Sequence, residues 1–235
     1  MTGDLLDAVT ERLDAVADPA TREWWERYLK GAVPFVGVKM AGVRRIAASV
    51  MRDHLASQPP RRRIDLALEC FSLPRCEEKL VGVLLLAEHL LDDLALEDVP
   101  RLAGPLERGH VTDWNTCDWF GVKVLGPFVL AGDDAVARAG AVAGWRASDV
   151  LWLRRAAAVA FVNLAADGDG VVPGLVDLVL DVCEANVADP TRWSQTSVGW
   201  VLRELSAAAP DRVVGFVEAH PELSAEARRT ALARL

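Results

Sequence analysis

Two tryptophans, a carboxylate and an arginine are the side chains of this sequence best suited to chemistry. Trp114 and Asp118 are four residues apart, so on a helix they lie one above the other on the same face. A carboxylate beside indole faces can hold a cationic centre, and a nearby arginine can bind phosphate. This combination suits the breaking of a glycosidic bond in a positively charged nucleotide. A buried carboxylate without partners is costly, which argues against a plain core position for Asp118.

Two later segments carry the same residue types. They are Trp152-Leu-Arg-Arg155 and Gly199-Trp-Val-Leu-Arg-Glu204, and in the second Trp200 and Glu204 repeat the spacing from aromatic ring to carboxylate. Simpler explanations stay open from the residues alone: Trp114 packs in a core with Asp118 in solvent, and Arg155 forms an ion pair between helices. We expect Glu204 to pair with an arginine such as Arg203 or Arg155 and to take no part in catalysis.

The elements that position these residues are predicted to be helices, because apolar residues recur with helical periodicity between short Gly, Pro and Asp breaks. Strand signals are nearly absent, so the predicted fold class is all-α. Pro127 lies inside a predicted helix, which should therefore kink or end early. The predicted helices span residues 3–17, 20–31, 40–57, 64–72, 75–93, 96–109, 113–131, 134–146, 149–166, 171–187, 192–208, 211–219 and 223–234.

The helices also repeat. Trp152 and Trp193 occupy equivalent places in two similar segments 41 residues apart, and Asp113 precedes Trp152 by 39. A period of about 40 residues in an all-helical chain is typical of HEAT-type repeats, which stack into a solenoid with a concave groove. We expect a single domain of such repeats over residues 1–235.

Composition limits the possible partners. The chain has 235 residues, of which 51% are hydrophobic and 26% charged, as in a globular protein and not a disordered one. Its net charge of −8 argues against indiscriminate nucleic-acid binding. Among its 26 basic residues only four are lysines, and arginine forks onto phosphate oxygens as lysine does not. A genome rich in G and C explains the arginines equally well.

No apolar run reaches the roughly 18 residues of a membrane span, and the acidic N-terminus does not resemble a signal peptide, so we expect a cytoplasmic protein. The four cysteines form no metal-binding pattern and are predicted to be reduced structural thiols. No metal and no cofactor is expected. Asp167-Gly-Asp-Gly170 is interpreted as a turn between helices and not a calcium loop. The tryptophans predicted to serve in packing are Trp24, Trp25, Trp119, Trp145 and Trp152.

Several of these segments together resemble the HEAT-like-repeat DNA glycosylases of the AlkD family, over almost the whole chain and best from about residue 113 to 206. Residues 28–45 resemble that family's N-terminal helix-loop-helix, with Pro34-Phe-Val-Gly-Val38 before Arg44-Arg45. Residues 113–118 are similar to its Trp-Asp-x-Val-Asp segment, and residues 152–157 to its Trp-Leu-Gln-Arg-Ala-Ala. Its Gly-Trp-Val-Leu-Arg-Glu recurs unchanged at residues 199–204.

The resemblance implies hydrolysis of the N-glycosidic bond of cationic N3- or N7-alkylated purines in duplex DNA, without insertion of the base into a pocket and with tolerance of bulky adducts. We expect a monomer. Two departures, Asn115 and Thr196, bear on lesion preference and on the hold on DNA. The alternative is a catalytically silent HEAT-repeat module that binds DNA or protein. The implied catalytic residues are Asp118, Trp114 and Trp200, and the predicted DNA-binding residues are Arg155, Arg154, Arg44, Arg45, Lys39 and Arg203.

Overall fold

The computed structural model describes residues 2–235, and every regular element in that range is a helix. The described residues contain no strand, so the predicted all-α class is confirmed. None of their helices is both long and apolar enough to cross a bilayer. The chain divides into two compact units, residues 1–119 and residues 120–235. The single domain over 1–235 stays a prediction.

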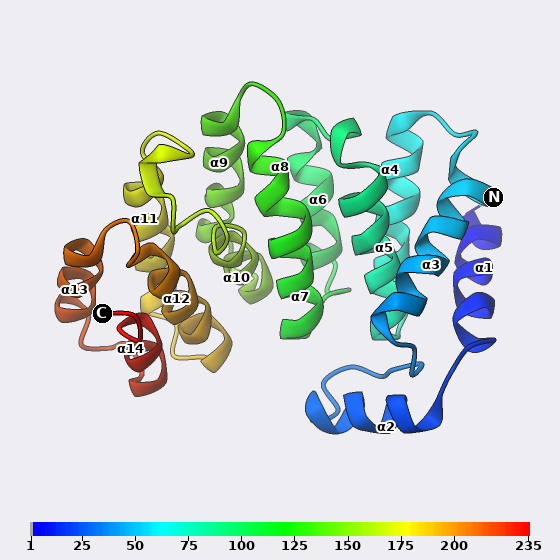
Figure 1. Cartoon of the computed structure of the whole chain (residues 1–235), viewed down its shortest axis with the longest axis horizontal. Coiled ribbons are helices and arrows are strands. Elements are labelled where there is room, and N and C mark those ends of the chain that lie inside the picture. The colour runs from blue at the N-terminus through cyan, green and yellow to red at the C-terminus, as the bar shows by residue number, and fades with distance from the viewer. Residues whose placement is uncertain (1) are drawn as a thin grey trace. The chain divides into compact units, whose positions relative to one another are not determined.

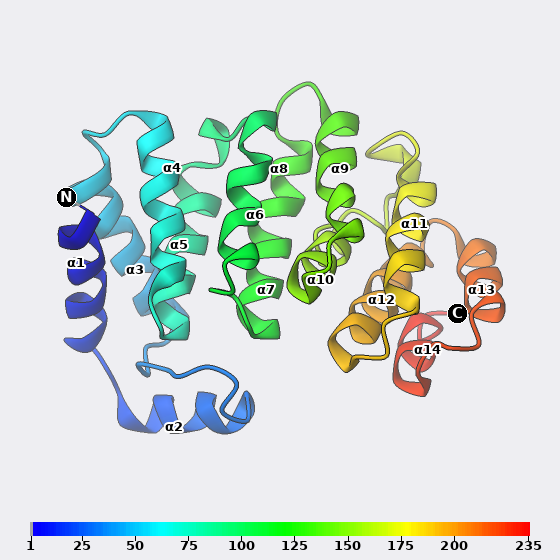
Figure 2. The same cartoon turned by 180° about the vertical axis from the view of Figure 1, so that it is seen from behind.

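The first unit consists of paired helices around an apolar core. α3 packs against α5, and α4 packs against α5 and α6. α1 contacts each of the three helices α3, α4 and α5. α2 lies crosswise at one end of these helices, as Figure 1 and Figure 2 show from opposite sides, and it buries none of its residues. The helices are α1 (Thr2–Asp14), α2 (Pro19–Tyr28), α3 (Met40–Val50), α4 (Pro60–Glu69), α5 (Cys76–His89), α6 (Val99–Glu107) and α7 (Trp114–Phe120), with short π or 3₁₀ segments at η1 (Met51–Leu55), η2 (Cys70–Ser72), η3 (Leu91–Asp93) and η4 (Leu96–Asp98).

The second unit is built in the same way. α12 packs against α10, α11 and α14, and α9 packs against α8 and α11. Gly199 of α12 makes the contact with α14 possible, because a Cβ there would lie 2.7 Å from the carbonyl oxygen of Ala227. The elements are η5 (Gly121–Leu125), α8 (Gly126–Leu130), α9 (Ala135–Ala143), η6 (Gly144–Ala147), α10 (Leu151–Val159), η7 (Gly168–Gly170), α11 (Leu175–Val187), α12 (Arg192–Leu205), α13 (Pro210–Ala219) and α14 (Ala225–Ala231).

The equivalent positions of the predicted repeat lie against each other. The rings of Trp152 on α10 and Trp193 on α12 have centroids 6.4 Å apart and planes tilted by 32°. Residues 41 apart in sequence therefore occupy neighbouring places in a stack of helices, as a helical repeat requires. The assignment to the HEAT type in particular, and the concave groove, stay predictions.

The helix predicted over residues 113–131 accommodates its proline by a change of winding. α7 has α-helical winding only as far as Phe120, and a five-residue π turn, η5, follows before α8 begins at Gly126. The amide of Gly126 bonds to the carbonyl of Gly121, so Pro127 starts a new helix at a position where its missing N–H is tolerated. The α-helix therefore ends early, as predicted, while the helical path runs on to Leu130.

Two predictions were wrong. The helix predicted over 149–166 ends at Val159, and turns stabilised partly by i to i−3 bonds carry the chain to Asp167. The exposed residues that follow Val159 are Asn163, Ala166 and Asp167, and their spacing fits a helix, so the apolar pattern does not distinguish an α-helix from tighter turns. Trp24 is not a packing residue in the core, because 53% of its surface is exposed.

Candidate functional site

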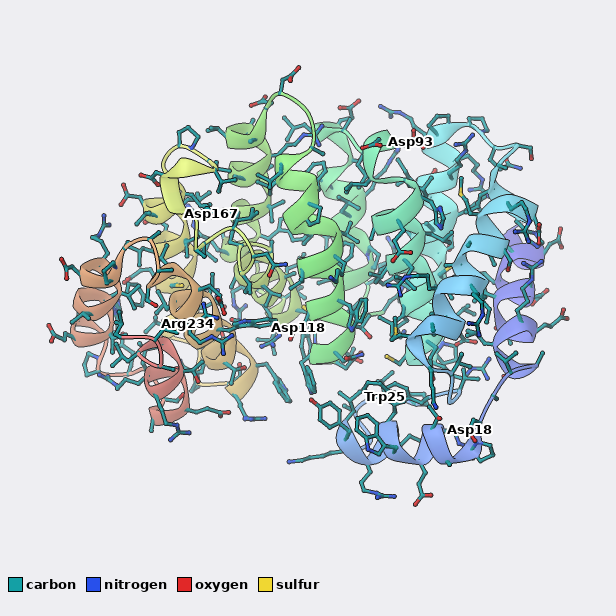
Figure 3. The ribbon with its side chains drawn as sticks, in the orientation of Figure 1. Asp18, Trp25, Asp93, Asp118, Asp167 and Arg234 are labelled. Carbon is teal, nitrogen blue, oxygen red and sulfur yellow. The ribbon has the colours of Figure 1, made fainter. Side chains whose placement is uncertain are left out.

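The candidate site begins at the first turn of α7. Asp113 caps this helix, since its Oδ1 accepts the amide N–H of Thr116 at 2.8 Å. Trp114 and Asp118 follow one turn apart, and both are partly exposed. Figure 3 shows Asp118 on α7. The predicted placement of the two side chains on one helix is therefore confirmed, while their catalytic role stays a prediction.

Polar groups are buried beneath this turn. Asp113 is 1% exposed, and its Oδ2 has no hydrogen-bond partner among the described residues. Burial raises the pKa of Asp113 and lowers the pKa of Lys79. The ammonium group of Lys79 donates to the carbonyl oxygens of Phe71, Leu73 and His110 at 2.6–3.0 Å. These bonds join the segment between α4 and α5 to the loop that leads into α7, so this buried group supports the candidate site from below.

Asn115, where the sequence departs from the family's Trp-Asp-x-Val-Asp segment, has its side chain directed into the protein. Asn115 is 8% exposed, and its amide donates to the Sγ of Cys76 at 3.3 Å. Thr116 also contacts this sulfur, at 3.7 Å. Burial raises the pKa of the Cys76 thiol well above its ordinary value. The second position of the family segment thus packs α7 on α5 in this chain, and it does not lie beside the exposed faces of Trp114 and Asp118.

An aromatic series runs from Trp114 onto α2. Tyr28 meets Trp114 edge-on with ring centroids 5.7 Å apart, and Trp24 stacks on Tyr28 at 5.3 Å with planes 7° apart. Trp25 contacts both of these rings edge-on and also stacks on Phe35 at 5.6 Å, which attaches α2 to the loop before α3. Tyr28 is 54% exposed. Tyr28 was not among the predicted site residues, although it stands in the segment that resembles the family's N-terminal helices.

Glu77 holds the loop that joins α2 to α3. Its carboxylate is 2% exposed and accepts the backbone N–H groups of Val36, Gly37 and Val38 at 2.8–3.0 Å. Glu77 was not predicted to have a role. The only sequence signal for it is a pair of acidic residues in the first turn of an otherwise apolar helix. Through this loop Glu77 positions both α2 and the first turn of α3.

Gly37 of the same loop has a positive φ of 99°, which favours glycine. A Cβ at this position would lie 2.3 Å from the carbonyl oxygen of Asp18. The Phe-x-Gly segment of residues 35–37 is therefore required by a close approach of two backbones. It is a structural feature that brings α2 and α3 together.

In the second unit, Arg155 is buried. It is 4% exposed and donates to the carbonyl oxygen of Trp193 at 2.6 Å and to the hydroxyl of Thr196 at 3.1 Å. These bonds join α10 to α12. Thr196, the second position that departs from the family pattern, therefore has a partner, because its hydroxyl accepts a hydrogen bond from Arg155. Contact of Arg155 with a DNA phosphate stays a prediction.

The other arginines predicted for DNA binding in this unit are held by carboxylates. Arg154 pairs with Asp189, and bonds from Thr191 and from Arg154 lower the pKa of Asp189. Arg203 donates to Glu204 at 2.7 and 3.0 Å, so the predicted pairing of Glu204 with Arg203 is confirmed. Trp200, one turn before Glu204 on α12, is partly exposed.

In the first unit the predicted basic residues lie at the start of α3. Arg44 donates its Nε to Glu88 at 2.7 Å. Lys39 and Arg45 are exposed and form no ion pair among residues 2–235. They are the predicted DNA-binding residues of this unit whose charge no carboxylate of the described chain neutralises by direct contact.

The remaining predictions concern sulfur and acidic turns. All four cysteines are free and buried, as predicted. Residues 168–170 form a 3₁₀ turn, and the carboxylate of Asp169 accepts the amide N–H of Val176 at 2.9 Å. This bond supports the interpretation of residues 167–170 as a turn between helices.

The class of fold agrees with what is known of similar proteins. The described chain is an all-α helical repeat, and a solved structure with this fold is described as a predicted DNA alkylation repair enzyme from Enterococcus faecalis. The two superimpose with a TM-score of 0.78 over 93% of this chain and 96% of that chain, at 17% identity. No protein of curated function matches the sequence. The model of the DNA alkylation repair enzyme family matches residues 9–235, so the chain belongs to that family.

Proposed function

We propose that the protein is a DNA glycosylase that hydrolyses the N-glycosidic bond of cationic N3- or N7-alkylated purines in duplex DNA. Membership of a DNA repair family supports the substrate class. The observation that carries the chemical assignment is the first turn of α7, where Trp114 and Asp118 lie one turn apart and both reach the surface. A helix that served only in packing has no need of a partly exposed indole and a partly exposed carboxylate on one face.

In the proposed reaction, the bond between the sugar and the alkylated base breaks with an oxocarbenium-like transition state. Asp118 stabilises the positive charge that develops on the sugar and orients the attacking water. Trp114 and Trp200 exclude solvent and attract the cation through their ring faces, by about 0.5–2 kcal/mol for each ring. No general acid is required, because departure of the base neutralises its own positive charge. A neutral lesion such as uracil lacks this advantage.

The proposed hold on DNA rests on phosphate contacts by arginines and one lysine. Lys39 and Arg45 support this role most directly, since both are exposed and unpaired with any carboxylate of residues 2–235. Of the proposed site residues, Trp114 and Asp118 belong to one compact unit, and Trp200 and Arg155 belong to the other.

One observation favours the second candidate, a silent helical-repeat module, in the form that binds protein. Arg44, Arg154 and Arg203 are all paired with carboxylates of the protein itself. An arginine already neutralised in this way attracts phosphate less strongly than one that is unpaired. The silent module would bind its partner without releasing a base.

The test is single-turnover release of N7-methylguanine from duplex DNA by wild-type protein and by Asp118→Asn. The substitution keeps the shape of the side chain and removes its charge. Loss of a preorganised electrostatic group costs about 10²–10³ in rate, so we expect release to fall at least tenfold while duplex affinity changes little. Release that is equally fast in both proteins would remove Asp118 from the chemistry. A wild type that binds but releases no cationic alkylpurine, bulky or small, would establish the silent module.

A further inference from the structure

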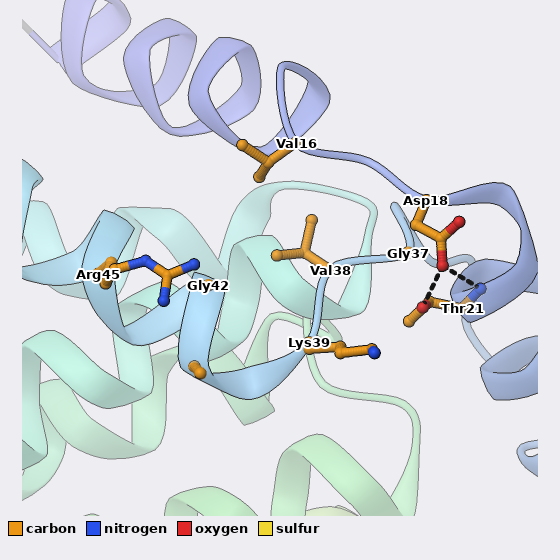
Figure 4. Close-up of a pocket in the computed structure, with 9 residues that line it drawn as sticks. Val16, Asp18, Thr21, Gly37, Val38, Lys39, Gly42 and Arg45 are labelled. Atoms are coloured by element: carbon orange, nitrogen blue, oxygen red, sulfur yellow. Dashed lines mark hydrogen bonds between the residues drawn. The ribbon is translucent and has the colours of Figure 1, made fainter.

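A groove lies between α2 and the first turn of α3. One part has a volume of about 460 Å³ and is lined by Trp24, Trp25 and Lys39 among others. The adjoining part, drawn in Figure 4, has a volume of about 390 Å³ and continues to Arg45. The two parts share Asp18, Thr21 and Lys39, so they form one continuous groove. Each part alone lies within the roughly 300–1,000 Å³ of typical ligand sites.

One end of this groove is aromatic and exposed. The Trp24 indole is 53% exposed, although it is packed edge-on against Trp25 at 4.7 Å and stacked on Tyr28 at 5.3 Å. These contacts fix the orientation of the ring and leave more than half of its surface in water. A large, oriented indole that buries so little of its area contributes little to folding, and it offers a flat surface for another ring.

The other end of the groove is cationic. Arg45 lines this end and Lys39 lines the part that both ends share, and neither has an ion pair within residues 2–235. The one carboxylate of the lining, Asp18, accepts the N–H of Thr21 at 3.0 Å and also its hydroxyl, and so caps α2. These bonds from Thr21 lower the pKa of Asp18, and the charge of Lys39 contributes in the same direction. The lining therefore has a net positive charge in a protein whose net charge is −8.

We propose that this groove binds an unpaired nucleotide of a DNA strand, with the base stacked on Trp24 and its phosphates at Lys39 and Arg45. A cationic track beside an aromatic face is the combination by which proteins bind single-stranded nucleic acid, because every base has a face that can stack. In an intact duplex that face is covered by neighbouring bases. The groove thus selects for unpaired DNA, and its binding requires neither a lesion nor base release.

The experiment measures the affinity of a fluorescein-labelled oligothymidylate and of a labelled hairpin duplex by fluorescence anisotropy. Trp24→Ala should weaken binding of the single strand by about five- to 150-fold, the range measured for loss of one base stack, while duplex affinity changes less than about twofold. Trp24→Phe keeps a stacking face and should restore most of the affinity. Because Trp24 is largely exposed, its truncation leaves the core intact, which thermal unfolding will verify.

Charge variants test the other end of the groove. The double variant Lys39→Ala with Arg45→Ala should reduce the salt dependence of single-strand binding by about 0.7 for each phosphate that is no longer neutralised. Asp18→Asn keeps the helix cap, removes the opposing charge and should strengthen binding. Arg27→Ala is the matched control, since it removes an exposed arginine of the same helix that pairs with Glu23 at 2.8 Å, outside the groove lining.

The outcomes separate this site from the proposed excision. Single-strand affinity that is unchanged in Trp24→Ala, or reduced equally by Arg27→Ala, would overturn the proposed groove. An equal loss on single strand and duplex would also overturn it, because it would make Trp24 an ordinary duplex contact. If Trp24→Ala loses single-strand binding and the wild type releases no alkylated base, the groove stands and only the proposed glycosylase activity is refuted.

Discussion

Glu77→Gln is the substitution whose effect follows most directly from the contacts. The Glu77 carboxylate accepts the N–H groups of Gly37 at 2.8 Å and Val38 at 3.0 Å through one oxygen, and the N–H of Val36 at 2.9 Å through the other. In the variant, the amide NH₂ replaces one of these oxygens, and because it is itself a donor it cannot accept the backbone N–H that the oxygen accepted. The remaining bonds lose their charge assistance.

A hydrogen bond to a charged group contributes about 1.5–3 kcal/mol, and a buried group left without a partner costs about 1–3 kcal/mol. We therefore expect the free energy of unfolding to fall by about 2–4 kcal/mol, which corresponds to a decrease in Tm of roughly 4–16 °C for a chain of this size. The loop held by Glu77 joins α2 to α3. Its loosening should weaken the contact between Tyr28 and Trp114 as well.

Thermal unfolding and amide hydrogen exchange measure this effect. Exchange should accelerate most at Val36, Gly37 and Val38, because these amides lose their acceptor. Glu88→Gln is the matched control: it neutralises a carboxylate near the surface whose partner is Arg44, and exposed pairs contribute only about 0–1 kcal/mol. If Glu77→Gln is as stable as Glu88→Gln and the three amides exchange as in the wild type, the anchoring role is refuted.

Two further substitutions test the supports of the candidate site. Burial raises the pKa of Asp113 in the folded protein, so the contribution of this group to stability decreases as pH rises from its unfolded pKa through its folded pKa. Asp113→Asn keeps the cap and should raise Tm at neutral pH by about 2–4 °C for each kcal/mol gained in the free energy of unfolding. The difference in Tm between variant and wild type should shrink toward about pH 4. A difference in Tm that is independent of pH in thermal scans would contradict this. Arg155→Ala removes the bonds to Trp193 and Thr196 and should destabilise the protein by about 1–3 kcal/mol in denaturant titrations. If Arg155 also contacts a phosphate, the log–log salt slope of binding should fall by about 0.9 on damaged and undamaged duplex alike, and an unchanged slope would remove that contact.

The helices were predictable because their signal is local and repeated. Apolar spacing, prolines at the breaks and the interval between Trp152 and Trp193 each indicate paired helices, and the contact between those two rings bears the repeat out. The end of α10 was not predictable, because the exposed residues after Val159 keep a helical spacing, which does not separate α-helix from turn. Pro127 predicts that the helix is interrupted, but it does not predict that the interruption is a π turn.

The candidate site was predictable where it depends on one helix and not where it depends on long-range contacts. The spacing of Trp114 and Asp118 places them on one face of α7 from sequence alone. The partners of Glu77 are about 40 residues away in sequence, at Val36, Gly37 and Val38, so no local pattern identifies them. Exposure of Trp24 was also missed, because a tryptophan in an amphipathic segment is ordinarily buried. Tertiary context decides these positions.

The central claim is that the protein breaks glycosidic bonds of cationic purines, and base release by the wild type under single-turnover conditions tests it most directly. Two duplexes of identical sequence are compared, one with N7-methylguanine and one with uracil at a single position, and free base is separated by chromatography. We expect release of N7-methylguanine well above the spontaneous rate and no release of uracil. Release of uracil at a comparable rate would contradict the proposed dependence on a cationic leaving group.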